Sequence, residues 1–213
     1  KVRFLMIVGN VYRDLGLFDG ARSVLEVAVE LADREGPVEA RIDAQARIEL
    51  GMLELTDGSL EAARRHYLRA AEIVEQRMTD NLQARFVALG GLGHVYAREG
   101  RLDAAREAYG DALGLIRRVK PPGDPQIGLA LGNLGYIMME QGDWEAASDV
   151  TSEAIEIFEV SLGPDHPVVA RAANNLANCQ GELGRLEEAY SLHGRVVGIR
   201  ERVLGSDHPD TAQ

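Results

Sequence analysis

Apolar residues recur along this chain at the three- and four-residue spacing of amphipathic helices, in pairs of stripes separated by a short break. In the stretch from about Val87 to Gln126, the first stripe is formed by Leu89, Leu92, Val95 and Tyr96. The second stripe is formed by Leu102, Ala105, Ala108, Tyr109, Ala112, Leu115 and Ile116. Gly100 lies in the break, where a glycine typically ends a helix because it adopts a left-handed backbone without strain. The pattern predicts a hairpin of two helices.

The break recurs every 42 residues with the same residue types around it, which indicates a tandem array. Its glycines are Gly16, Gly58, Gly100, Gly142 and Gly184, and five alanines keep step at Ala21, Ala63, Ala105, Ala147 and Ala189. Acidic residues follow three positions after each glycine, where they favour a helix start: Asp19, Glu61, Asp103, Glu145 and Glu187. Small residues lie seven positions before the glycine, at Gly9, Gly51, Gly93, Gly135 and Ala177. Twelve positions after it lie Ala28, Ala70, Ala112, Ala154 and, in the fifth repeat, Val196. We expect them to let antiparallel helices pack closely, in an all-α solenoid of five hairpins.

Prolines mark the start of later repeats. Pro125 follows Asp124, and Leu162-Gly163-Pro164-Asp165-His166-Pro167 returns 42 residues later as Leu204-Gly205-Ser206-Asp207-His208-Pro209. Proline is favoured in the first turn of a helix, so each of these prolines should begin a first helix. We interpret Asp165-His166 as a helix-start signal and not as a metal site, because His166 and His208 lie a full repeat apart.

The order of these residues resembles the tetratricopeptide repeat, most clearly in Leu92-Gly93, Tyr96, Gly100, Ala105, Tyr109 and Ala112. That repeat usually has a period of about 34 residues, and the longer period here is similar to the variety in kinesin light chains and many bacterial regulatory proteins. HEAT and armadillo arrays share the period range but do not predict the small-residue pairs. The resemblance implies one α-α superhelix over residues 1–213, with repeats at about 2–43, 44–85, 86–127, 128–169 and 170–211 and the start of a truncated sixth.

Composition narrows the possible functions. The net charge of −11 disfavours a nucleic-acid surface, and no apolar stretch is long enough to span a bilayer. The single cysteine, Cys179, cannot form an intrachain disulfide and favours a reducing, cytoplasmic compartment; we expect it to be a buried, inert thiol. No catalytic, phosphate-binding or metal motif is present, and His94 with Arg98 lacks a nucleophile on the same face. We expect a protein without enzymatic activity, cofactor or metal.

In this family the first helices line a concave groove, and the resemblance implies a binding surface on them. The predicted peptide-binding residues are Asn10, Arg13, Met52, His94, Arg98, Gly132, Asn133, Tyr136, Arg171, Asn174, Asn175 and Asn178, accompanied by Met6, Ile48, Leu55, Gly90 and Glu140. The N-terminal half of the surface is apolar and rich in methionine, whereas the C-terminal half is rich in asparagine, whose amides both donate and accept. The alternative is that the asparagines bond across to the next repeat and the methionines pack inside. The lysine-rich carboxylate clamp of some family members is not expected, since the first helices lack lysine.

Three glycines on first helices fall outside the main packing positions: Gly90, Gly91 and Gly132. Mid-helix glycine costs about 0.5–1 kcal/mol relative to alanine. Our hypothesis is that all three keep the groove deep, so that a ligand can approach the backbone closely.

These observations favour a non-catalytic scaffold that binds a protein or peptide. One alternative is a ligand-sensing module of a larger signalling or transcription-regulating protein, and another is self-association through the ends of the array. The first helix should expose Val2, Phe4 and Leu5. Terminal repeats normally have polar caps, so this exposure supports self-association, or indicates that the sequence is a piece of a longer polypeptide.

Overall fold

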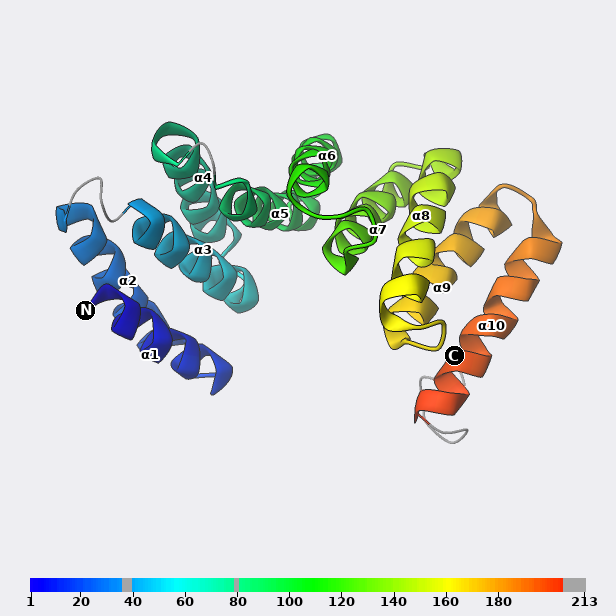
Figure 1. Cartoon of the computed structure of the whole chain (residues 1–213), viewed down its shortest axis with the longest axis horizontal. Coiled ribbons are helices and arrows are strands. Elements are labelled where there is room, and N and C mark those ends of the chain that lie inside the picture. Colours follow the sequence, from blue (N-terminus) through cyan, green and yellow to red (C-terminus); the bar gives the residue numbers. More distant parts are fainter. Residues whose placement is uncertain (36–39, 79–80, 205–213) are drawn as a thin grey trace. The chain divides into compact units, whose positions relative to one another are not determined.

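A computed structural model describes residues 1–35, 40–78 and 81–204, and this described part contains ten α-helices and no strand (Figure 1). The helices are α1 (Val2–Asp14), α2 (Phe18–Glu35), α3 (Ala40–Asp57), α4 (Leu60–Arg77), α5 (Leu82–Arg98), α6 (Leu102–Val119), α7 (Pro125–Glu140), α8 (Trp144–Leu162), α9 (Pro167–Glu182) and α10 (Leu186–Leu204). The predicted all-α class of helix hairpins is therefore confirmed. The second copy of the linker motif and the start of a sixth repeat lie beyond the described residues.

Each hairpin turns at the predicted glycine. All five glycines have a positive φ, between 72° at Gly100 and 88° at Gly58. The N–H that follows each glycine donates to a carbonyl five residues earlier, as from Arg101 to Tyr96 at 2.9 Å. This bond satisfies a carbonyl that the end of the first helix would otherwise leave without a partner. The turn is thus a local property of the sequence, because only glycine adopts this backbone without strain.

The prolines begin helices as expected. Pro125 opens α7, and the N–H of Gln126 donates to the Asp124 carboxylate at 2.9 Å. Pro167 opens α9, where the N–H of Val168 donates to His166 Nδ1 at 3.2 Å. The prediction that His166 marks a helix start is confirmed, because its ring caps α9.

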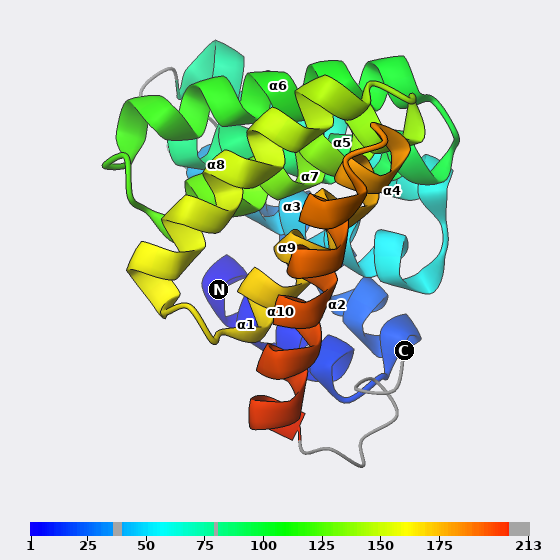
Figure 2. The same cartoon turned by 90° about the vertical axis from the view of Figure 1, so that its right-hand side faces the viewer.

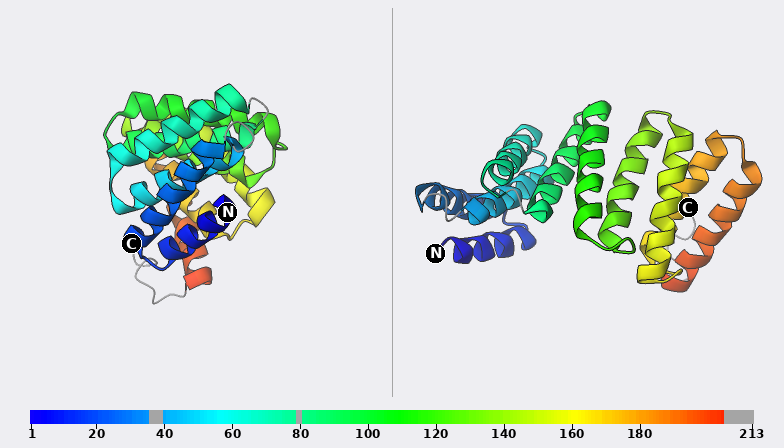
Figure 3. Two further views of the ribbon diagram at one scale, coloured as in Figure 1. Left: turned by 90° about the vertical axis from the view of Figure 1, so that its left-hand side faces the viewer. Right: turned by 45° about the horizontal axis from the view of Figure 1, so that its top comes forward.

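The chain divides into two compact units, Lys1–Leu115 (unit 1) and Ile116–Gln213 (unit 2). In unit 1 the first helices α1, α3 and α5 contact one another in sequence, α2 packs against α3, and α4 packs against α5 (Figures 1 and 3). In unit 2, α7 contacts both α8 and α9, and α10 packs beside α9 (Figure 2).

Small residues create the space between helices. The alanines five positions after the turn are buried in all five repeats. A Cβ on the glycine seven positions before the turn would lie within 3 Å of the side chain nine positions after it. These pairs are Gly9 with Leu25, Gly51 with Tyr67, Gly93 with Tyr109 and Gly135 with Thr151. Each glycine thus accommodates one particular side chain of the second helix.

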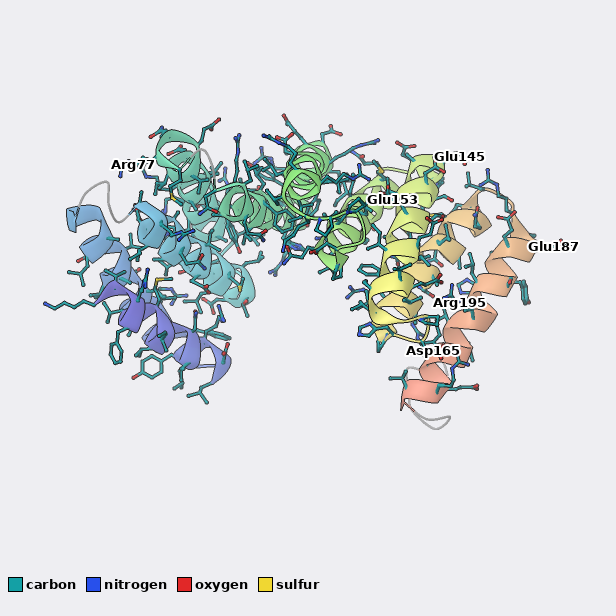
Figure 4. The ribbon with its side chains drawn as sticks, in the orientation of Figure 1. Arg77, Glu145, Glu153, Asp165, Glu187 and Arg195 are labelled. Carbon is teal, nitrogen blue, oxygen red and sulfur yellow. The ribbon has the colours of Figure 1, made fainter. Side chains whose placement is uncertain are left out.

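Ion pairs in unit 2 link α8 to α10 and to the turn that precedes α10. Arg195 of α10 pairs with Glu159 of α8, and Figure 4 shows Arg195 on the side of α10 that faces α8. Arg185 pairs with Glu145 at 2.8 Å. Exposed pairs of this kind contribute at most about 1 kcal/mol each, so they orient the hairpins more than they stabilise them.

The exposed side of α1 differs in part from the prediction. Phe4 is exposed (68%), as expected, but Val2 is buried (3%) and Leu5 is half-buried. Val2 packs with Ala28 and Ala32 of α2, because the first residue of α1 already faces its own hairpin partner. In the described part of the chain, no helix is long and apolar enough to cross a membrane.

Candidate functional site

A pocket of about 330 Å³ opens between α7 and α9 in unit 2, and we call it the α7–α9 pocket. Its walls come from the exposed faces of the two first helices, and α8 supplies the floor. Six of its lining residues are Gly132, Asn133 and Tyr136 of α7, Arg171 and Asn175 of α9, and Phe158 of α8. Asn133 and Asn175 lie 42 residues apart, so they occupy the same position in two successive repeats.

The asparagine amides in and near this pocket make no hydrogen bond to any other described residue. Asn133 and Asn175 are half-buried, and within the described residues neither makes a hydrogen bond. The same holds for Asn174 and Asn178, so none of the four asparagines bonds across to another repeat within the described residues. Each amide keeps its donor and acceptor for a ligand. Of these four, only Asn133 and Asn175 line the pocket.

The other polar groups of the pocket are a phenol and a guanidinium. Partial burial raises the pKa of Tyr136, and the carboxylate of Glu140, one turn along α7, raises it further through its charge and a hydrogen bond. Arg171 is exposed and has no ion-pair partner among the described residues. A Cβ on Gly132 would meet nothing within 4 Å, so this backbone is open to a ligand, as our hypothesis for Gly132 requires.

In unit 1 the predicted groove residues are largely used in contacts between repeats. Arg13 Nη1 donates to Glu49 Oε2 at 2.9 Å and also approaches Met52 Sδ at 3.4 Å, which ties α1 to α3. Arg98 Nη1 donates to the carbonyl of Leu55 at 2.6 Å, which ties α5 to α3. These arginines therefore interlock neighbouring first helices, although Met52 itself stays exposed.

The remaining unit 1 candidates are also engaged or enclosed. His94 Nδ1 and the hydroxyl of Tyr109 form a 2.8 Å hydrogen bond, and the rings meet edge to face. Asn10 is half-buried, and its Oδ1 is enclosed without a hydrogen-bond partner. Ile48, which we expected in the groove, is 1% exposed and belongs to the core cluster between α3, α4 and α5.

The hypothesis that three glycines deepen the groove is wrong for Gly91. A Cβ on Gly91 would lie 2.3 Å from Cε1 of Tyr67, so this glycine makes room for an α4 side chain and is buried. Gly90, by contrast, has open space where a Cβ would be. The two glycines are neighbours in sequence but face in different directions, because one helical residue turns about 100° from the next.

Sequence reasoning considered only first helices and so missed the contribution of second helices. Thr151 and Phe158 of α8 reach the α7–α9 pocket because Gly135 and Gly128 leave room for them. For Thr151 the signal was available, since in the first four repeats the position nine residues after the turn glycine faces a glycine of the first helix. No cluster able to hold a metal occurs within the described residues, and burial raises the pKa of the Cys179 thiol, as expected for a buried, inert cysteine.

Comparisons with known proteins agree with this fold. The family model described as Tetratricopeptide repeat matches residues 42–118, 84–157, 126–195 and 168–213. No curated protein sequence matches the chain significantly. Among solved structures, BtubC (BKLC) from P. vanneervenii is similar with a TM-score of 0.75 and 22% identity, over 90% of this chain and 76% of that one.

Two other structures illustrate the range of relatives. Nearly identical repeats of a putative kinesin light chain from Podosopora anserina give a TM-score of 0.80 at 18% identity, over 95% of this chain and 96% of that one. A signal transduction ATPase with a tetratricopeptide repeat sensor, PH0952 from Pyrococcus horikoshii, gives 0.77 at 20% identity, over 95% of this chain but 30% of that one. These identities show a shared fold.

Proposed function

The chain belongs to the tetratricopeptide repeat family, and from this premise we propose that it is a non-catalytic scaffold whose α7–α9 pocket binds a peptide segment of a partner protein. The observation that carries the proposal is the pair of free amides, Asn133 and Asn175, at one register of adjacent first helices. An asparagine amide both donates and accepts, which matches the N–H and C=O of a peptide backbone.

The rest of the pocket suits such a ligand. Gly132 leaves space for close approach of a peptide backbone, while Phe158 and the exposed Leu129 offer apolar contact. Arg171 adds a charge-assisted donor at the rim. The volume of about 330 Å³ lies at the small end of ligand pockets, so we expect it to take one or two side chains of a longer segment.

The test compares partners captured from cell extract by the wild-type chain and by two double variants. Asn133→Ala with Asn175→Ala removes both pocket amides, whereas Asn174→Ala with Asn178→Ala removes two asparagines of α9 that lie outside the pocket. We expect specific partners to be lost from the first variant and kept by the second. Identical partners for all three proteins would move the site away from the pocket.

A bulky substitution gives an independent measurement. Gly132→Leu fills the open space above α7 without touching a packed neighbour, so the fold should persist while capture is lost. Circular dichroism checks the fold. Retained capture by a folded Gly132→Leu variant would contradict binding in this pocket.

A ligand-sensing role is the first alternative. It is supported by the likeness to the Pyrococcus horikoshii protein, whose repeats are described as a sensor. A DNA-binding or nucleotidase domain attached in the full-length gene product would favour this alternative over a plain scaffold.

Self-association is the second alternative, and an apolar stripe on α1 favours it. Phe4, Ile7 and Val11 are 68%, 63% and 50% exposed, at the spacing of one helical face. One repeat later, Ala46 and Leu53 stand at the positions of Phe4 and Val11 and are fully buried. Molecular mass measured across a concentration series tests this alternative, with Phe4→Glu as the variant expected to stay monomeric. A wild-type chain that is monomeric throughout would exclude it.

A further inference from the structure

Helix α1 exposes two apolar side chains at positions that are buried in every other first helix. These side chains are Phe4 and Val11, and their positions recur every 42 residues. The buried equivalents are Ala46, Ala88, Ala130 and Ala172 for Phe4, and Leu53, Val95, Ile137 and Cys179 for Val11. The face that other first helices bury is therefore uncovered on α1.

Helix α10 exposes two positions that the preceding second helix buries. Ser148 and Ile155 of α8 are buried, whereas Tyr190 and Val197, one repeat later, are 84% and 39% exposed. In unit 1 these positions face the next first helix, because Arg22 of α2 pairs there with a carboxylate of α3. The exposed face of α10 is thus the one on which a first helix packs.

Ion pairs show which residues meet when a second helix packs on the following first helix. Arg22 of α2 pairs with Asp57 at the end of α3, with Nη2 and Oδ2 2.7 Å apart. Arg64 of α4 pairs with Glu99, just after α5, with Nε and Oε1 3.4 Å apart. Both pairs join residues that lie 35 positions apart. The two junctions therefore share one register.

At the two ends, the residues in these positions are apolar. Tyr190 takes the position of the two arginines, and Leu15, just after α1, takes the position of the two carboxylates. Leu15 is 66% exposed. Terminal repeats normally present a polar outer face, so an exposed leucine and an exposed tyrosine at matched positions indicate that the two faces are covered together.

We infer that copies of this chain join end to end, with α1 of one copy packed on α10 of the next in the register of the internal junctions. A second copy is the occupant that fits, because each copy carries both faces, and Leu15 of one meets Tyr190 of the other. The contact joins two different surfaces, so each added copy leaves a surface for another. This junction rests on the self-association alternative of the proposed function and names the second surface that it needs.

Molecular mass, measured by sedimentation across a concentration series, tests the junction. The wild-type mass should rise above that of one chain as the concentration increases. Phe4→Glu and Tyr190→Glu each place a charge without a partner in the junction, so each should weaken association about tenfold or more. Val160→Glu makes the same kind of change at an 85% exposed residue of α8 and should associate as wild type. Circular dichroism checks that all variants fold.

Mixing two variants distinguishes an end-to-end contact from a symmetric one. The Phe4→Glu copy keeps its α10 face, and the Tyr190→Glu copy keeps its α1 face. An equimolar mixture should therefore form one-to-one pairs at concentrations where each variant alone stays monomeric. A symmetric contact between two α1 helices would give the opposite result, because Tyr190→Glu would then associate as wild type without any mixing.

A pair of substitutions tests the register. Leu15→Asp and Tyr190→Arg should each weaken association when made alone. Combined in one chain, they should restore it, because the arginine of one copy then meets the aspartate of the next, as Arg22 meets Asp57 inside the array. Association of this double variant should also weaken with added salt.

Three outcomes would overturn the junction. They are a wild-type chain that is monomeric throughout, a Tyr190→Glu variant that associates as well as Val160→Glu, and a mixture that forms no pairs. The second outcome, with Phe4→Glu still monomeric, would leave self-association in place but through α1 alone. Partner capture by the α7–α9 pocket is measured separately on other residues, so its failure and the failure of the junction are distinguishable.

Discussion

Gly90 and Gly91 of α5 form a matched pair that tests the packing between repeats. The ring of Tyr67 lies against both Gly51 of α3 and Gly91 of α5. A Cβ on Gly91 would approach Tyr67 Cε1 to 2.3 Å, whereas a Cβ on Gly90 would meet nothing within 4 Å. Gly91→Ala and Gly90→Ala therefore add the same methyl group to neighbouring positions of one helix, one into packed space and one into open space.

The structure sets the direction of each change in the free energy of unfolding. The added methyl group by itself should raise the free energy of unfolding of both variants by about 0.5–1 kcal/mol, because alanine loses less backbone entropy than glycine when a helix forms. Gly91→Ala also overpacks the interface. The Tyr67 ring is 3% exposed and also lies against Gly51, so it has little space to move into, and overpacking costs about 1–3 kcal/mol. The shared gain cancels in the comparison, so Gly90→Ala should be about 1–3 kcal/mol more stable than Gly91→Ala.

Urea unfolding followed by far-ultraviolet circular dichroism measures the difference. We expect the midpoint to rise for Gly90→Ala and to fall for Gly91→Ala, relative to wild type. Adding Tyr67→Leu should reduce the penalty of Gly91→Ala, which a double-mutant cycle would show as a coupling energy. A Gly91→Ala variant as stable as Gly90→Ala would refute the contact between Gly91 and Tyr67.

Three further predictions concern local features of the fold. Gly142→Ala should lower the free energy of unfolding by about 1 kcal/mol, measured by urea unfolding, because φ is +77° at this turn. Asp124→Ala should cost about 1 kcal/mol in the same assay, since the carboxylate caps α7. Burial, helped by Arg65 and Arg47, lowers the pKa of His66 below 6.5. The folded state therefore favours neutral His66, and wild type should lose stability relative to His66→Gln as the pH falls below about 6.5, but not above it. A parallel pH dependence of the two proteins would contradict this.

Sequence by itself determined where each hairpin turns and where later helices begin. Gly16, Gly58, Gly100, Gly142 and Gly184 all adopt the expected backbone, and Pro125 and Pro167 open helices as expected. These features are local, because a positive φ or a proline acts on the backbone of its own turn whatever surrounds it. The buried alanines were predictable for a related reason, since a strict 42-residue period places each in an equivalent environment.

Only the tertiary structure decided which groove residues are available to a ligand. Arg13 and Arg98 occupy predicted groove positions, yet each bonds to a neighbouring repeat. Asn133 and Asn175 lie one repeat apart at the same position of their first helices, and neither makes a hydrogen bond to another described residue. The physical reason is that these contacts depend on the reach of side chains from adjacent helices. Such side chains vary from repeat to repeat, even where the backbone pattern stays the same.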